Sequence, residues 1–354
     1  MCEYTQNMIV RSKAPLRLGF AGGGSDVSPY SELYGGLVLN ATINLFAYCT
    51  IEQTENSKLE LYASDLGVSV VYNLDSSFPI DGTLDLHKGV YNRVIADFGV
   101  TPRACRITTY SDAPAGSGLG SSSTMVVCVL KAFVEWYNLP MGDYEIARMA
   151  YQIERIDLGL SGGKQDQYAA SFGGFNYMEF QQNGAVVVNP LRVKRWIVDE
   201  FESSIVLYYT GASRSSAAII EEQQKNTISE NQQAIEAMHK IKNSAIDMKR
   251  ALLEGNIPLF TDLLGRAWED KKKMASAISN AMIQSVFDVA VKAGASAGKV
   301  SGAGGGGFII FMMEPTKRRQ VINALKELPG EVVGFQFSDG GTHGWKIYEN
   351  NNCI

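Results

Sequence analysis

The stretch Pro114-Ala115-Gly116-Ser117-Gly118-Leu119-Gly120-Ser121-Ser122-Ser123 places three glycines and four serines within ten residues. It lies between a predicted strand at Ala104–Thr109 and a predicted helix at Ser122–Asn138. Small residues let successive backbone N–H groups point into one concavity, and the start of a helix adds a partial positive charge. The stretch therefore predicts a loop that binds a polyphosphate. A glycine-rich turn followed by a serine N-cap is the structural alternative.

Two comparisons narrow the kind of nucleotide site. A Walker A loop requires a lysine, and residues 114–123 contain none. A second run, Gly302–Gly307, satisfies the dinucleotide spacing G-x-G-x-x-G, which works only where a helix follows. Here Phe308–Met312 has the composition of a strand, so an NAD-dependent oxidoreductase is disfavoured. We expect these glycines to let the backbone approach a phosphate or a neighbouring loop.

Two carboxylates follow the polyphosphate loop in the chain. Glu154 ends a predicted helix at Asp143–Asp157, and Asp166 lies twelve residues later within Gly-Gly-Lys-Gln-Asp-Gln. A carboxylate at a helix start is kept ionised by the helix dipole, which suits a group that accepts or orients a proton. Alone, either residue is as well explained as a surface charge or a cap; together with the loop they indicate phosphoryl transfer.

The chain has 354 residues, 45% of them hydrophobic, with a formal net charge of -5. This acidic net charge does not indicate the basic surface that binds nucleic acid. No apolar run reaches the length of a membrane span, and the polar start predicts no signal peptide. Five scattered cysteines and three distant histidines give no metal-ligand spacing. We therefore expect a cytoplasmic protein with neither a membrane nor a nucleic-acid partner.

Strand and helix patterns mix in both halves of the chain, which predicts an α+β fold with a boundary near Val193–Phe201. Residues 215–273 have helical spacing and could form part of a homodimer surface. We interpret the run Lys271-Lys272-Lys273 as a solvated helix face.

Three motifs together resemble those of the GHMP kinases. They are Lys13-Ala14-Pro15-Leu16-Arg17, the loop Pro114–Ser123 and Ser301–Gly307, in the order that the family has them. The resemblance implies two domains, at 8–195 and 196–354. The first would be like ribosomal protein S5 domain 2 and the second ferredoxin-like, with ATP and Mg²⁺ bound between them.

The resemblance also assigns roles to matched positions. It implies that Asp166 is the catalytic aspartate, and that Arg17 steadies this aspartate or polarises the acceptor hydroxyl. Glu154 and Ser122 would hold the magnesium ion. The remaining loop residues would bind the nucleotide: Pro114, Gly116, Ser117, Gly118, Leu119, Gly120, Ser121, Ser122 and Ser123.

The segment after Arg17 narrows the substrate. Galactokinases have Gly-Glu-His-Thr-Asp where this chain has Gly22-Gly23-Gly24-Ser25-Asp26, which enlarges the sugar pocket. Ala14–Asp26 and Tyr209–Arg214 resemble the heptose- and fucose-kinase branch. This resemblance implies transfer to the anomeric hydroxyl of a heptose 7-phosphate. Its substrate-binding residues would be Gly23, Gly24, Ser25, Asp26, Gly304 and Arg214.

A sugar phosphate also needs cations at the far end of its pocket. Arg214, Lys13, Arg192 and Lys194 are candidates that the sequence does not rank. A fucokinase or another hexose 1-kinase stays open, since an unphosphorylated sugar needs no such cation. A non-catalytic sugar-binding relative is disfavoured because Asp166, Glu154 and Arg17 occur together.

Overall fold

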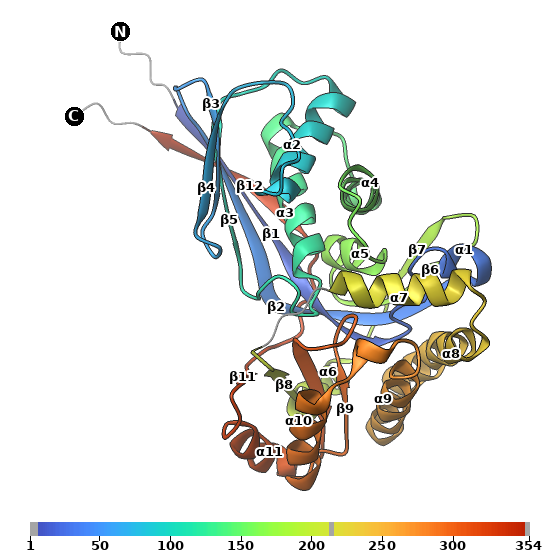
Figure 1. Cartoon of the computed structure of the whole chain (residues 1–354). Helices are drawn as coiled ribbons and strands as arrows, with labels where there is room; N and C mark the ends of the chain where they lie inside the picture. Colours follow the sequence, from blue (N-terminus) through green and yellow to red (C-terminus); the bar gives the residue numbers. More distant parts are fainter. Residues whose placement is uncertain (1–5, 212–215, 351–354) are drawn as a thin grey trace.

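The computed structural model describes residues 6–211 and 216–350, which form two β-sheets with helices packed on them (Figure 1). The larger sheet has the order β12-β1-β2-β5-β3-β4, and β6 and β7 extend it from β2. Neighbouring strands are antiparallel except β3 and β5, which are parallel. The bounds are β1 Gln6–Ala21, β2 Gly36–Gln53, β3 Lys58–Ala63, β4 Val68–Asn73, β5 Cys105–Ser111, β6 Phe175–Phe180, β7 Val186–Pro190 and β12 His343–Asn350.

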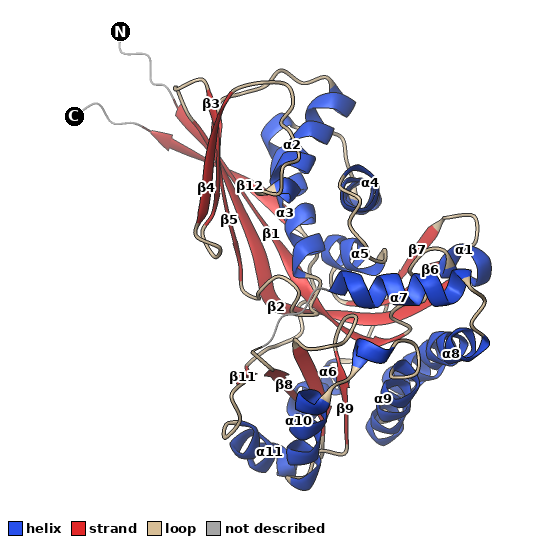
Figure 2. Cartoon of the chain, in the orientation of Figure 1, coloured by secondary structure: helices blue, strands red, loops and turns tan. Residues whose placement is uncertain are grey.

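Helices cover one face of this sheet (Figure 2). They are α2 Asp85–Phe98, α3 Ser121–Tyr137, α4 Asp143–Gln152 and α5 Gln165–Phe172. Alternate strand side chains such as Val10, Ile51 and Ile107 point toward them and form one core with Leu130 and Phe133 of α3. Helix α3 is apolar on almost every side because the sheet and the other helices surround it. The N-terminal end of α3, which follows the loop at residues 114–123, is therefore held in a fixed position.

The smaller sheet is antiparallel, in the order β11-β8-β10-β9. Its strands are β8 Ile205–Tyr209, β9 Ala297–Val300, β10 Phe308–Met312 and β11 Glu331–Val333. Phe311 and Tyr208 pack with α10 Ala281–Lys292 and α11 Arg318–Leu325. The other face, with Leu207 and Ile310, packs with α6 Arg195–Ser204, α8 Gln232–Glu254 and α9 Ile257–Lys271.

The two sheets share a hydrophobic core. The second half of β1 leaves the first core, and Leu16, Leu18 and Phe20 are fully buried together with the smaller sheet. The Phe20 ring centroid lies 5.5 Å from that of Phe260 on α9. Because β1 belongs to both cores, the residues along it have a fixed position between the two halves.

The remaining elements are short or lie at the junction. They are α1 Tyr30–Tyr34, a π-helical turn at Ile153–Asp157, α7 Ser216–Ile228, and 3₁₀ turns at Ser276–Ile278 and Pro315–Lys317. Among the described residues, no helix combines the length and the apolar character that crossing a bilayer requires.

The α+β prediction is confirmed, and Phe308–Met312 is the predicted strand, with the same bounds. The expected boundary near Val193–Phe201 is occupied by α6. The last strand, β12, pairs with β1 in the larger sheet, so the chain beyond residue 196 contributes to both halves.

The segment that returns the chain from β11 to β12 is pinned against α5. Ser338 O accepts from Gly174 N at 3.0 Å, and Thr342 N donates to Ala170 O at 2.8 Å. A Cβ on Gly341 would lie 2.0 Å from Ser171 O, whereas a Cβ on the adjacent Gly340 would meet nothing within 4 Å. The return segment therefore supports the C-terminal end of the helix that carries Asp166.

Gly341→Ala is expected to lower the free energy of unfolding by about 2 kcal/mol or more, because backbone atoms must move to admit the methyl group. Gly340→Ala, the matched control, should change it by less than about 0.5 kcal/mol. Urea denaturation followed by circular dichroism measures both. Equal effects of the two substitutions would contradict the close packing of Gly341 on α5.

Candidate active site

The polyphosphate loop has the strand-loop-helix context that the sequence predicts. It connects β5 to α3, and Gly116, Gly118 and Gly120 all have positive φ, at +73°, +84° and +78°. Ser121 Oγ donates to Pro114 O at 3.0 Å and closes the loop internally. The left-handed glycines turn the backbone repeatedly, which favours a concave loop at the start of α3.

The second glycine run is the loop of the β9–β10 hairpin, and it packs on the polyphosphate loop. Ser301 Oγ donates to Gly118 O at 2.8 Å, and Phe308 N donates to Ser117 O at 2.9 Å. A Cβ on Gly118 would lie 2.5 Å from Ser301 O, and one on Gly302 would lie 2.6 Å from Gly118 Cα. The expectation that this run approaches a neighbouring loop is confirmed, and no helix begins there.

Arg17 and Asp166 form a partly buried ion pair at the edge of this loop. Asp166 is the second residue of α5, and its Oδ1 accepts from Arg17 Nε at 2.7 Å and lies 2.6 Å from Arg17 Nη2. Arg17 Nη1 donates to Gly118 O at 2.6 Å. The arginine therefore orients the carboxylate and joins it to the polyphosphate loop, as the sequence analysis expects of this pair.

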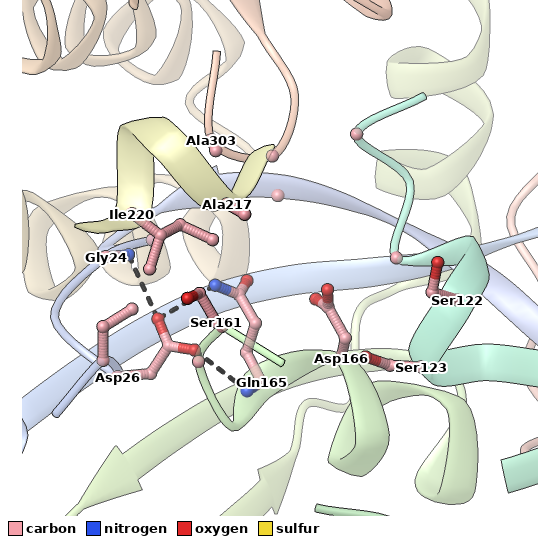
Figure 3. Close-up of a pocket in the computed structure, with 18 of the residues that line it drawn as sticks. Gly24, Asp26, Ser122, Ser123, Ser161, Gln165, Asp166, Ala217, Ile220 and Ala303 are labelled. Carbon is pink, nitrogen blue, oxygen red and sulfur yellow. Dashed lines mark hydrogen bonds between the residues drawn. The ribbon is translucent and has the colours of Figure 1, made fainter. Parts of the chain in front are cut away.

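Glu154 lies in the π-helical turn and is 1% exposed. Its Oε1 accepts from Ser123 Oγ at 3.0 Å, and its Oε2 accepts from Gln167 Nε2 at 2.5 Å. Burial raises the pKa of this carboxyl group. The structure brings Ser123, rather than the predicted Ser122, into contact with Glu154. Ser122 also lines the cavity (Figure 3).

Asp26 holds the start of α5. Its Oδ2 accepts from Lys164 N at 2.9 Å and Gln165 N at 3.0 Å, and its Oδ1 accepts from Gln165 Nε2 and Gly24 N (Figure 3). A Cβ on Gly163 would lie 2.0 Å from Asp26 Oδ2, so glycine is required there. Four hydrogen bonds occupy this carboxylate, which the sequence analysis expects to bind sugar.

These residues surround one cavity of about 440 Å³. Its walls come from β1, the polyphosphate loop, the segment before α5, α7 and the β9–β10 loop. Ala217 and Ile220 of α7 lie over Asp26, on the side away from Ser122 and Ser123 (Figure 3). The cavity therefore has a phosphate-loop end and an Asp26 end, with Asp166 between them.

Several predicted residues lie outside this lining. Ser25 Oγ donates to Gly22 O at 2.7 Å, away from the cavity, and Gly304 packs on Ile278 O. Lys13 lies over the Phe46 ring. Arg214 is outside the described residues. Other predicted residues that do not line the cavity are Pro114, Ser117, Leu119, Arg192 and Lys194.

The sequence analysis missed two lysines that do line the cavity, Lys271 and Lys299. The interpretation of Lys271-Lys272-Lys273 as a solvated face is wrong at its first position. Lys271 is 3% exposed, whereas Lys272 and Lys273 pair with Glu269 and Asp270. Helical phase could have separated Lys271 from its neighbours, because it lies on the buried side of α9 with Leu264 and Trp268.

Comparisons with known proteins agree with this geometry. The family model "GHMP kinases N terminal domain" matches residues 85–174, and "GHMP kinases C terminal" matches residues 248–330. The chain is 47% identical over 338 residues to the D-glycero-alpha-D-manno-heptose 7-phosphate kinase of Campylobacter jejuni, covering 96% of this chain and 99% of the relative.

Two solved structures extend the comparison. A D-glycero-D-manno-heptose 1-phosphate kinase from Bacteroides thetaiotaomicron is 60% identical, with a TM-score of 0.84 over 96% of this chain and all of that chain. The Methanococcus jannaschii mevalonate kinase has a TM-score of 0.74 at 20% identity and covers 93% of this chain and 98% of its own. The second likeness concerns the fold alone.

Gly118→Ala is expected to destabilise the protein and reduce activity, because the new methyl group would separate the two glycine loops. Gly184→Ala is the matched control, since Gly184 has φ +83° and open space around it. Both substitutions place alanine at a left-handed backbone position that favours glycine, so both should lower the free energy of unfolding. The close contact should lower it by about 1–3 kcal/mol more in Gly118→Ala than in Gly184→Ala. Thermal melts test this difference; equal shifts in melting temperature would argue against the contact.

Proposed function

Because this chain belongs to the GHMP kinases, we propose that it transfers the γ-phosphoryl group of ATP to the anomeric hydroxyl of D-glycero-D-manno-heptose 7-phosphate. The bond between the γ-phosphorus and the bridging oxygen breaks, a bond to the anomeric oxygen forms, and ADP leaves. The products are the 1,7-bisphosphate, ADP and a proton. The observation that carries the proposal is the Arg17–Asp166 pair at the edge of the polyphosphate loop.

The relatives support a heptose phosphate as the substrate. The Campylobacter jejuni enzyme is named for the 7-phosphate and the Bacteroides thetaiotaomicron structure for the 1-phosphate. In a heptose 7-phosphate the anomeric hydroxyl is free to accept a phosphoryl group. The position of transfer is therefore the part of the proposal that needs its own experiment.

Asp166 is the group that we assign to the acceptor hydroxyl. Arg17 holds its Oδ1, so the carboxylate is oriented beside the cavity. An ionised carboxylate can orient the hydroxyl and take its proton as the oxygen attacks. The guanidinium of Arg17 also offsets the negative charge on the transferring phosphoryl group.

The polyphosphate loop would bind the nucleotide phosphates through its backbone N–H groups. The start of α3 adds its dipole, and the contact with the β9–β10 loop keeps the loop from spreading. Transfer between two bound substrates depends mainly on alignment and charge stabilisation, and both need a rigid loop.

A magnesium ion fits the donor set beside this loop. Glu154 has a buried carboxylate whose pKa is raised by burial, and a cation would favour its charged form. Glu154 and the Ser122 hydroxyl would hold the ion, and Ser123 and Gln167 orient the carboxylate. When bound, magnesium neutralises charge on the nucleotide phosphates.

A coupled ATP-consumption assay over heptose 7-phosphate, heptose 1-phosphate, fucose, galactose and mannose tests the substrate. We expect turnover on heptose 7-phosphate, with ³¹P NMR showing a new anomeric phosphate in the product. Turnover on fucose alone would reassign the protein to the fucokinase branch. A product phosphorylated at another carbon would overturn the anomeric assignment.

Asp166→Asn should lower kcat by about 10²–10⁴-fold, because the amide cannot take the proton of the acceptor. ATP affinity, measured by calorimetry, should change little. Asp157→Asn is the control, since Asp157 also pairs with an arginine, Arg93, but does not line the cavity. Wild-type turnover in Asp166→Asn would remove Asp166 from its proposed role.

Glu154→Gln should raise the magnesium concentration needed for half-maximal activity by about tenfold or more, because the amide carries no charge. Glu236→Gln, on the exposed side of α8, is the control. Magnesium titrations at saturating ATP give both values. An unchanged magnesium requirement in Glu154→Gln would place the ion elsewhere.

A further inference from the structure

Lys271 is a buried cation that faces the cavity without a carboxylate partner. It is the last residue of α9, is 3% exposed and donates from Nζ to Gly302 O. Among residues 6–211 and 216–350, its ammonium group forms no ion pair. A buried charge of this kind is costly unless something compensates for it.

The other buried lysines of the described chain have more partners than Lys271. Lys88 pairs with Asp81 and Asp85, and Lys164 pairs with Glu32 at 2.8 Å. Lys299 Nζ donates to the carbonyl oxygens of Gly19 and Phe20 at 2.9 and 2.8 Å, which attaches β9 to β1. Lys271 has one carbonyl contact, so at least two of its three N–H donors have no partner among these residues.

The charges around Lys271 do not balance it. Burial, with a smaller contribution from nearby Arg17, lowers the pKa of Lys271 to about 8, although Asp26 opposes the shift. Asp26 already accepts four hydrogen bonds from the start of α5. Arg17 is committed to Asp166. This part of the cavity is therefore short of negative charge when no ligand is bound.

Lys271 lies close to both Arg17, at the reaction centre, and Asp26, at the other end of the cavity. Its contact, Gly302, belongs to the hairpin loop, and Met274, three residues on, has its Cε 3.0 Å from the Cβ position of Gly24. Gly24 is in the segment that precedes Asp26, whereas Ser123 and Glu154 mark the nucleotide end. Gly302 also packs on Gly118 of the polyphosphate loop, so Lys271 lies between that loop and the Asp26 end, where an anionic group of the acceptor can approach it.

We infer that Lys271 binds the phosphate group carried by the sugar substrate and so makes the enzyme prefer a phosphorylated sugar. This inference rests on the proposed function, and it replaces the cation candidates drawn from the sequence. The sugar phosphate would supply the charge that balances the ammonium group. An ammonium–phosphate contact inside a cavity is stronger than one at the surface, because less water screens it.

The inference predicts an unusual stability effect. Lys271→Met removes an uncompensated charge, so the ligand-free variant should melt at the same temperature as wild type or higher at pH 7. The folded pKa, about 8, lies below the unfolded value, so the destabilisation is complete below pH 8 and fades as pH rises toward the unfolded pKa, about 10.5. Thermal melts from pH 7 to 10 should show this difference shrinking.

The charged groups that face Lys271 also affect how the stability difference between wild type and variant changes with pH. Arg17 comes from β1, Asp26 from the loop after β1, and Lys299 from β9. Burial lowers the pKa of Lys299 and Lys271 adds to this effect, so the difference between wild type and variant includes the change at Lys299 as well as the loss of Lys271. A difference that does not change with pH would show that the ammonium group is not an uncompensated charge.

Kinetics of wild type, Lys271→Met and Lys273→Met test the ligand. Lys273 is the matched control because it has the same substitution two residues on and is exposed. We expect Lys271→Met to raise KM for heptose 7-phosphate by about 10- to 100-fold. Its KM for ATP and its activity on the unphosphorylated heptose should change by much less than its KM for heptose 7-phosphate.

The alternative outcomes identify other roles. Equal losses on the phosphorylated and unphosphorylated heptose, or a raised KM for ATP, would assign Lys271 to the transferring phosphoryl group and overturn the inference. Lys271→Gln, which keeps a donor for Gly302 without the charge, repeats the test if the methionine variant does not fold. Similar kinetics in Lys271→Gln and wild type would also overturn it.

Calorimetry with heptose 7-phosphate and no ATP separates this inference from the proposed function. Binding to wild type that weakens at least tenfold in Lys271→Met supports the role of Lys271 even if no phosphoryl transfer is found. Transfer to heptose 7-phosphate with equal binding by both proteins would leave the proposed function standing and remove Lys271 from it. Absence of binding to wild type would overturn both.

Discussion

The carbonyl oxygen of Gly118 is the point on which the rest of the site depends. It accepts from Arg17 Nη1 at 2.6 Å and from Ser301 Oγ at 2.8 Å, two residues that are 101 and 183 positions away in the chain. A buried carbonyl with two donors is strongly placed, because moving it would leave those donors unpaired. One peptide group therefore joins the polyphosphate loop, the first strand and the β9–β10 hairpin, and glycine is the residue that lets them come close enough.

The orientation of Asp166 depends on this carbonyl group through Arg17. Arg17 holds its carboxylate from one side, while Asp26 caps the start of α5 and the return segment before β12 packs on its other end. A short helix has little stability by itself, so these outside contacts determine where its side chains point. The geometry of the Arg17–Asp166 pair is thus a product of long-range packing, although both residues lie in or close to sequence motifs.

Sequence patterns predict the parts of the site that depend on local chemistry. A glycine–serine loop between a strand and a helix is recognisable because the backbone conformation itself requires those residues, and Phe308–Met312 is recognisable because it is apolar and short. Other features depend on partners that a linear pattern does not contain. The pairing of β12 with β1, the hydrogen bonds that occupy Asp26 and the burial of Lys271 arise only when distant segments meet. Glu154 is found from its spacing, but its contact with Ser123 depends on the π-helical turn.

The distribution of charge in the cavity separates what the fold needs from what a ligand needs. Arg17 and Asp166 satisfy one another, Asp26 is satisfied by backbone N–H groups, and Lys299 is satisfied by backbone carbonyl groups. These groups would be just as well placed in a protein that binds nothing. Lys271 is different, since it forms no ion pair with any described residue and its ammonium group has a single carbonyl partner, Gly302 O. A residue that lowers stability and has no structural role is expected where a ligand supplies the missing interaction. The unpaired charge of Lys271 therefore marks the part of the cavity where an anion binds.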